Sequence, residues 1–128
     1  MICVHKARVP TEDEEQIALF RWAALAAAAH PELKLLFHIP NGGSRGKAEA
    51  GRFRAMGVKA GVPDLFLPVP RRGFYGLFIE LKRTKGGRLS PEQEEWLDAL
   101  VEKGYMARIC LGWEEASRVI LAYLEGGK

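Results

Sequence analysis

The sequence predicts an α/β domain in which a mixed central β-sheet of about four strands is flanked by helices. Apolar residues recur at helical spacing in some segments, while other segments are short apolar runs bounded by glycine and proline. These two kinds of segment alternate along the chain, which is typical of mixed α/β layers. With 128 residues, we expect a single domain spanning residues 1–128, with its core over about 11–124.

The first half of the chain is expected to form a helix, a strand and a second helix. Thr11 can cap the first helix, because four acids follow it where the helix dipole favours negative charge. Pro31 ends this helix, and Gly57 is a suitable C-terminal residue for the second, basic helix. The three elements are expected at residues 11–29, 33–39 and 47–56.

The second half is expected to form a hairpin, a helix, a strand and a last helix. A turn at 70–73 separates the two hairpin strands. The helix after the hairpin has Ser90 as its N-cap, Pro91 at its first position and Gln93 at its third. The five elements are expected at residues 64–69, 75–83, 90–103, 105–111 and 113–124.

Composition excludes several classes of protein. No apolar stretch reaches the ~18–20 residues of a membrane span, and the N-terminus lacks the features of a secretory signal. Cys3 and Cys110 have no metal-ligand spacing, which favours two free thiols in a reducing cytoplasm. The net charge of +3 permits a polyanionic partner, and basic residues cluster in 45–59 and 71–88. We therefore expect a cytoplasmic protein without a membrane segment.

Two acids and a lysine stand out in the hairpin. Side chains alternate along a strand, so Phe78, Glu80 and Lys82 share one face. Burying such charges is unfavourable unless they are paired or bind a metal. Asp64 opens the preceding strand, and in a hairpin it would lie beside Glu80. Two neighbouring carboxylates repel each other unless a divalent cation lies between them.

This arrangement suits phosphodiester hydrolysis. Carboxylate oxygens hold Mg²⁺ or Mn²⁺, and the metal polarises a phosphate and lowers the pKa of a bound water. Lys82 can orient that water or stabilise the developing charge. A third acid often completes such a site, and Glu12 is preferred because Gln16 lies one turn further on the same helix face. Glu14 and Glu15 remain alternatives.

The spacing of these residues resembles a known signature. Pro63-Asp64, fifteen intervening residues and Glu80-Leu81-Lys82 resemble the PD-(D/E)XK nuclease superfamily. The surrounding sequence is similar to the VRR-NUC family over about residues 11–113. The segments that carry this similarity are HIPNGG.R at 38–45, GVKAGVPDLFLPV at 57–69, GLFIELKR at 76–83, GGRLSPEQ at 86–93, and the pair Glu12 and Gln16.

The resemblance implies a restriction-endonuclease-like core and a Mg²⁺ or Mn²⁺ site. Asp64, Glu80 and the backbone carbonyl of Leu81 would hold the metal. Lys82 would be the catalytic lysine, and Gln93 the family's helix glutamine near the site. Stand-alone members of this size come largely from phages and bacteria, and resemble Holliday-junction resolvases in forming homodimers that cut branched DNA. The implied partners are therefore DNA and a second copy, with no small-molecule cofactor.

Simpler interpretations stand beside these. Glu80 and Lys82 alone could be an edge-strand ion pair, and Gln93 is explained equally well by helix capping. The basic residues fit a solvated helix face as well as a phosphate contact. The alternative function is a DNA-binding or interaction module that does not cut. A restriction-type enzyme is less favoured, because little chain remains for a recognition subdomain. The DNA-contact candidates are Asn41, Gly42, Arg45, Lys47, Arg52 and Lys59.

Overall fold

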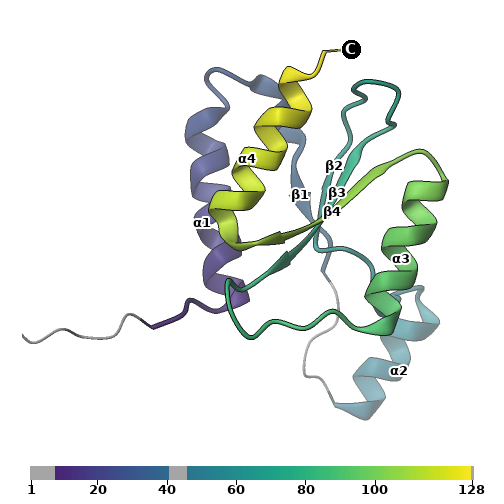
Figure 1. Ribbon diagram of the computed structural model, residues 1–128. Helices are drawn as coiled ribbons and strands as arrows, with labels where there is room; N and C mark the ends of the chain where they lie inside the picture. Colours follow the sequence, from purple (N-terminus) through teal and green to yellow (C-terminus); the bar gives the residue numbers. More distant parts are fainter. Residues whose placement is uncertain (1–7, 41–45, 128) are drawn as a thin grey trace, which may run out of the picture.

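The computed structural model describes residues 8–40 and 46–127 (Figure 1). The expected order of helices and strands is found, with one additional short helix. Three of the DNA-contact candidates, Asn41, Gly42 and Arg45, lie outside the described residues. The elements are α1 Glu12–Ala26, the 3₁₀ helix η1 Pro31–Leu35, β1 Phe37–His38, α2 Lys47–Ala55, β2 Leu65–Leu67, β3 Leu77–Lys82, α3 Pro91–Glu102, β4 Met106–Leu111 and α4 Gly112–Glu125.

The four strands form one mixed sheet in the order β1-β2-β3-β4. β1 and β2 are antiparallel, β2 and β3 form the expected antiparallel hairpin, and β3 and β4 are parallel. α1 and α4 lie together on one side of the sheet, while α3 packs against β4 from the other side (Figure 1). The predicted class, a mixed sheet of about four strands flanked by helices, is therefore confirmed.

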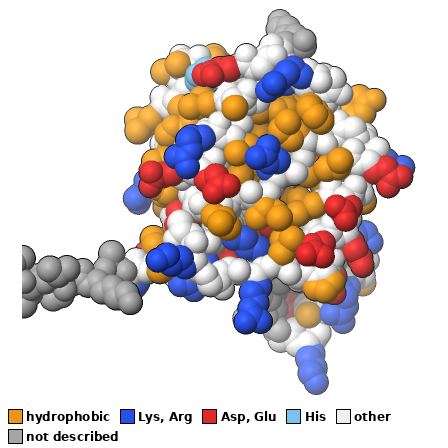
Figure 2. Space-filling model, viewed as in Figure 1, with side chains coloured by type: hydrophobic (Ala, Val, Ile, Leu, Met, Phe, Trp, Pro, Cys, Tyr) orange, Lys and Arg blue, Asp and Glu red, His pale blue; other side chains and the backbone are white. Residues whose placement is uncertain are grey.

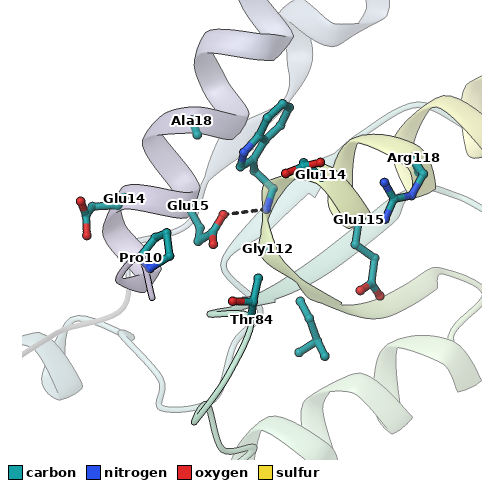
Figure 3. A pocket seen from close by; sticks show the side chains of 11 residues that line it. Pro10, Glu14, Glu15, Ala18, Thr84, Gly112, Glu114, Glu115 and Arg118 are labelled. Carbon is teal, nitrogen blue, oxygen red and sulfur yellow. Dashed lines mark hydrogen bonds between the residues drawn. The ribbon is translucent and has the colours of Figure 1, made fainter. Parts of the chain in front are cut away.

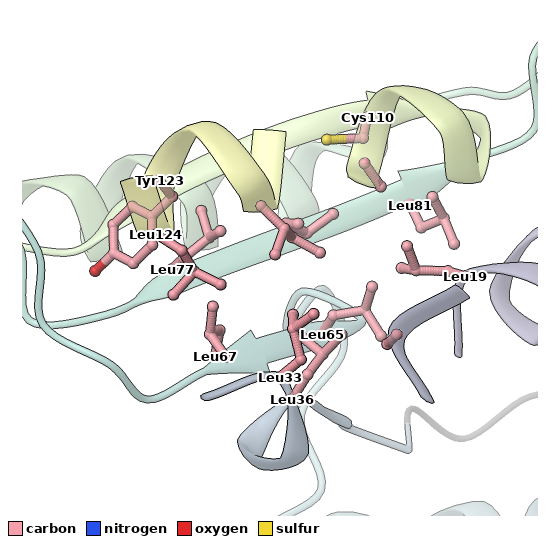
Figure 4. Packing of buried hydrophobic residues seen from close by; sticks show 14 of the residues in the cluster. Leu19, Leu33, Leu36, Leu65, Leu67, Leu77, Leu81, Cys110, Tyr123 and Leu124 are labelled. Carbon is pink, nitrogen blue, oxygen red and sulfur yellow. The ribbon is translucent and has the colours of Figure 1, made fainter. Parts of the chain in front are cut away.

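The core lies between the sheet and the α1–α4 pair, and it follows from the alternation along β3. Leu77, Ile79 and Leu81 are each 1% exposed and point toward these helices, as Figure 4 shows for Leu77 and Leu81. Tyr123 of α4 is also buried, and its hydroxyl donates a hydrogen bond of 2.6 Å to the carbonyl of Val69. The residues 78, 80 and 82 consequently face the opposite side of the sheet.

The segment expected as a strand at 33–39 is mostly helical, so that prediction was wrong in extent. Pro31 occupies the first turn of η1, where its fixed φ suits a helical start. Leu33 and Leu36 are the buried residues, three positions apart, which is the spacing of one helical turn and not of a strand. Only Phe37 and His38 pair with β2.

Two expectations from composition can be followed in the structure. In the described part of the chain, no helix has the length and apolar character needed to cross a membrane. Cys110 is a free thiol that is fully buried at β4, and burial raises its pKa to about 12. A thiol in this environment is a packing residue, because the reactive thiolate is disfavoured.

Candidate active site

Asp64 and Glu80 face each other across the hairpin. The register that pairs Leu65 with Ile79 and Phe66 with Phe78 continues to place Asp64 opposite Glu80. The backbone N–H of Leu81 donates a hydrogen bond of 2.8 Å to Asp64 Oδ2, which holds the Asp64 carboxyl group against β3. The two acids that the sequence singled out therefore meet at one end of the hairpin.

Glu80 is buried in a way that disfavours its charged form. The residue is 1% exposed, and its Oε1 has no hydrogen-bond partner among the described residues. The pKa of Glu80 is raised to about 9, chiefly by burial and then by the hydrogen bond and charge of Asp64, while the charge of Lys82 acts to lower it. A buried carboxylate oxygen without a donor requires an explanation, and a bound cation or a retained proton would supply one.

Lys82 and Gln93 belong to one hydrogen-bond network. Lys82 is 7% exposed, and its Nζ donates to Gln93 Oε1 at 3.1 Å. The same oxygen accepts from the backbone N–H of Ser90 at 2.8 Å, while the N–H of Gln93 donates to Ser90 Oγ at 3.2 Å. Gln93 therefore completes the capping box of α3 and also contacts Lys82. The two interpretations of Gln93 are compatible.

The loop before Asp64 is fixed against the start of α3. Gly61 has a φ of +91°, and a Cβ at this position would lie 2.6 Å from the backbone carbon of Glu92. Only glycine permits this approach. The backbone carbonyl of Asp64 also accepts a 2.7 Å hydrogen bond from Ile39 N–H. These contacts set Asp64 relative to the helix that holds Gln93, so that both sides of the site are positioned together.

The structure distinguishes the acids in the first turn of α1. Glu14 forms the capping box with Thr11 and pairs with Arg8 at 2.6 Å, and these contacts lower its pKa to about 2. Glu15 is buried and turned toward α4. Glu12 is exposed, and its charge raises the pKa of Glu80. Glu12 is thus the acid of this turn that acts electrostatically on the site.

Glu15 has a role that the sequence did not reveal. Its Oε1 accepts a 3.0 Å hydrogen bond from the backbone N–H of Trp113, and Figure 3 shows this carboxylate pointing from α1 to the first turn of α4. A carboxylate at a helix N-terminus satisfies a free N–H and complements the dipole. The contact lies in a pocket of about 540 Å³ whose lining includes neither Asp64 nor Glu80.

Metal-ligating side chains are few near the hairpin. Across residues 8–40 and 46–127, no group of three or more His, Cys, Asp and Glu side chains is arranged to hold an ion. A metal bound here would therefore rest on Asp64 and Glu80, completed by a main-chain oxygen and waters. Magnesium commonly binds proteins in this way, through one or two carboxylates while keeping several waters.

The described DNA-contact candidates are on the surface. Lys47 and Arg52 are exposed on α2, and Lys59 is exposed in the loop that follows. Figure 2 shows charges of both signs interspersed with apolar groups over the face viewed there, with basic side chains at the lower end where α2 lies. Their exposure is compatible with a phosphate contact and equally with a solvated face.

Comparisons with known proteins show which family the chain resembles in sequence and in fold. The model of the VRR-NUC domain family matches residues 13–114. A solved structure described as a VRR_NUC domain protein is similar to the chain with a TM-score of 0.79 and 30% sequence identity, over 95% of this chain and 94% of the other. No curated protein matches the sequence.

Proposed function

Because the chain belongs to the VRR-NUC domain family, which is a nuclease-type domain, we propose that it is a metal-dependent endonuclease that hydrolyses phosphodiester bonds in DNA. One observation carries this proposal. Glu80 is a buried acid opposite Asp64, its Oε1 has no donor within the described chain, and Lys82 lies two residues further on the same face. Two neighbouring acids, one of them buried, are unfavourable when nothing is bound between them, and a divalent cation bound there would offset that cost.

The residues fit a divalent cation. Asp64 and Glu80 would hold Mg²⁺ or Mn²⁺, with the backbone carbonyl of Leu81 as a further ligand. Oxygen ligands of this kind suit both ions, and the lone pair on Glu80 Oε1 is free to bind one. When bound, the metal polarises the phosphate and lowers the pKa of a coordinated water.

The chain's own groups would position and stabilise the reacting phosphate. Lys82 is held by the Gln93 carboxamide, so its ammonium group is oriented before substrate arrives. A fixed ammonium beside the carboxylate pair can orient the attacking water and stabilise charge on the phosphate oxygens. Gln93 acts as a positioning residue through Lys82. Glu12 is the candidate third acid, through its charge on the side of α1 that influences Glu80.

The preferred substrate is proposed to be branched DNA such as a four-way junction. The test is a panel of labelled four-way junction, flap and plain duplex with Mg²⁺ or Mn²⁺, using the wild-type chain and the Asp64→Asn, Glu80→Gln and Lys82→Ala variants. Wild type should cut at least one branched substrate and the variants none. If every substrate stays intact with wild type, the proposal fails; equal DNA affinity with and without metal would then favour the non-cleaving binding module.

Symmetric cutting of a junction needs two sites, so the proposed working unit is a homodimer. The outward face of α1 supports this, because Ile17 and Leu25 on it are 54% and 82% exposed. Asp13 and Arg21 lie four residues to either side of Ile17, and neither has an ion-pair partner in the described chain. In an antiparallel two-fold contact centred on Ile17, each Asp13 would face the partner's Arg21.

A further inference from the structure

A connected row of aromatic rings crosses the sheet beside the acids. Phe66 stacks on Phe78 with ring centroids 4.1 Å apart and an interplanar angle of 18°. Phe37 meets the edge of Phe66 at 5.9 Å, and Tyr105 meets Phe78 at 5.2 Å. Tyr75 extends the row with its ring 5.8 Å from Tyr105. These five rings are called the aromatic row below.

The aromatic row lies on the same face of the sheet as the carboxylates. Phe37, Phe66 and Phe78 are direct partners in the registers of β1, β2 and β3. Asp64 precedes Phe66 by two residues and Glu80 follows Phe78 by two residues, so alternation places all four side chains on one face. Two residues along a strand span ~7 Å. The nearest rings, Phe66 and Phe78, therefore lie next along this face from the carboxylate pair.

This face leaves the ends of the aromatic row open. α1 and α4 pack on the opposite side of the sheet, and α3 packs against β4 (Figure 1). Phe37 is 48% exposed and Tyr75 is 66% exposed. A Cβ at position 76 would lie 2.8 Å from the Phe66 ring, so the glycine there lets this ring lie close to the backbone just before β3. Exposed rings on the face that carries the two acids suit a ligand that has flat apolar surfaces of its own.

Nucleobases have such surfaces when they are unpaired. Aromatic side chains stack on them without regard to sequence, because every base has a π-face. In a duplex these faces are covered by neighbouring bases, so stacking on a protein ring requires a base to leave the helix. We propose that the aromatic row binds unpaired bases of the strand whose phosphate lies at Asp64 and Glu80. This inference rests on the proposed nuclease function and adds its substrate class: DNA with unpaired nucleotides beside the cut.

Binding without cleavage tests the aromatic row separately from the chemistry. A 12-nucleotide single strand carrying 2-aminopurine near its centre, and the same strand in a duplex, are titrated with the full chain in EDTA. Stacking on a ring quenches 2-aminopurine fluorescence. The variants are Phe37→Leu and Phe78→Leu, which keep apolar bulk but remove the π-face. Phe20→Leu on α1, a partly buried phenylalanine that makes none of the row's ring contacts, is the matched control. Thermal melting establishes that each variant is folded.

Wild type should bind the single strand more tightly than the duplex and quench the probe. Phe37→Leu and Phe78→Leu should each weaken single-strand binding by about 5- to 100-fold and restore fluorescence, with duplex binding and the Phe20→Leu control unchanged. Folded variants that bind and quench like wild type overturn the inference, even if the substrate panel is cut. Variants that lose a dimer in light scattering but keep binding also overturn it, because a second copy would then cover the rings. Quenching by a chain that cuts nothing supports the aromatic row and refutes the nuclease proposal.

Discussion

Replacing Glu80 by glutamine should stabilise the metal-free protein at alkaline pH. Between about pH 4.5 and 9, folded Glu80 keeps a proton that the unfolded chain releases, because its pKa is raised to about 9 from 4.5. The unfolded state then binds fewer protons, so the free energy of unfolding falls as pH rises through this window. Glutamine keeps the side-chain size and does not titrate. The difference between variant and wild type should therefore grow from pH 5 to pH 9.

The size of the effect follows from the pKa. At about 1.36 kcal/mol per pKa unit, the whole shift would correspond to ~6 kcal/mol. Because the charges of Asp64 and Lys82 act on Glu80 in opposite directions and water can reach a locally opened site, roughly half of this, about 2–3 kcal/mol, is expected at pH 8. Urea unfolding in EDTA at pH 5 and pH 8 measures it. Glu102→Gln, an exposed acid at the end of α3, is the control and should behave like wild type.

Metal addition should reverse the order of stability. Mn²⁺ should stabilise wild type at pH 8 by mass action and leave Glu80→Gln nearly unchanged. Since the Glu80 proton must leave before its oxygens bind a cation, binding should release up to about one proton. Calorimetry in two buffers with different ionisation enthalpies measures that release. If the free energy of unfolding of Glu80→Gln changes with pH and with Mn²⁺ as much as that of wild type, the raised pKa of Glu80 and its role as a metal ligand are both refuted.

Three further outcomes are expected. Gln93→Ala should lower kcat more than it weakens Mn²⁺ binding, because Lys82 loses its partner; steady-state cleavage and calorimetry separate the two, and equal losses would indicate general unfolding. Glu15→Gln should destabilise the fold by ~1–2 kcal/mol in urea, since a charged acceptor at the start of α4 is replaced by a neutral one; no change would show that the contact contributes little. In light scattering, Asp13→Arg or Arg21→Asp alone should weaken the dimer, and the double reversal should restore it. A double variant that stays monomeric would place the interface elsewhere.

The hairpin could be predicted from sequence because its pattern is local. The alternation from Leu77 to Lys82 fixes the face of each side chain, and the turn at 70–73 fixes which strand pairs with which. Because Asp64 directly precedes β2, its place opposite Glu80 follows from the strand register. The Ser90 capping box could also be predicted from the sequence, because its hydrogen bonds span only three residues.

Other features depend on contacts between distant segments, which one sequence does not specify. The acids at 12–15 all suit a first helical turn, and only the docking of α4 turns Glu15 inward to Trp113. The residues 33–39 are apolar enough for a strand or a helix, and the burial of Leu33 and Leu36 against the core decides for η1. The aromatic row needs β1 beside β2, an adjacency that no local pattern encodes.

The site departs from the pattern expected of a buried strand, whose side chains are normally apolar. β3 is an apolar strand apart from Glu80 and Lys82, and both charges are almost fully buried. Neutralising Glu80 would favour folding of the empty domain at alkaline pH, yet the loop at Gly61 and the hydrogen bond from Leu81 N–H hold Asp64 beside it. With this rigid support, the carboxyl groups of Asp64 and Glu80 cannot relieve their mutual repulsion by moving apart. They can do so only by holding a proton or, in the function proposed above, a cation, so the geometry that destabilises the empty fold would also supply the affinity for that metal.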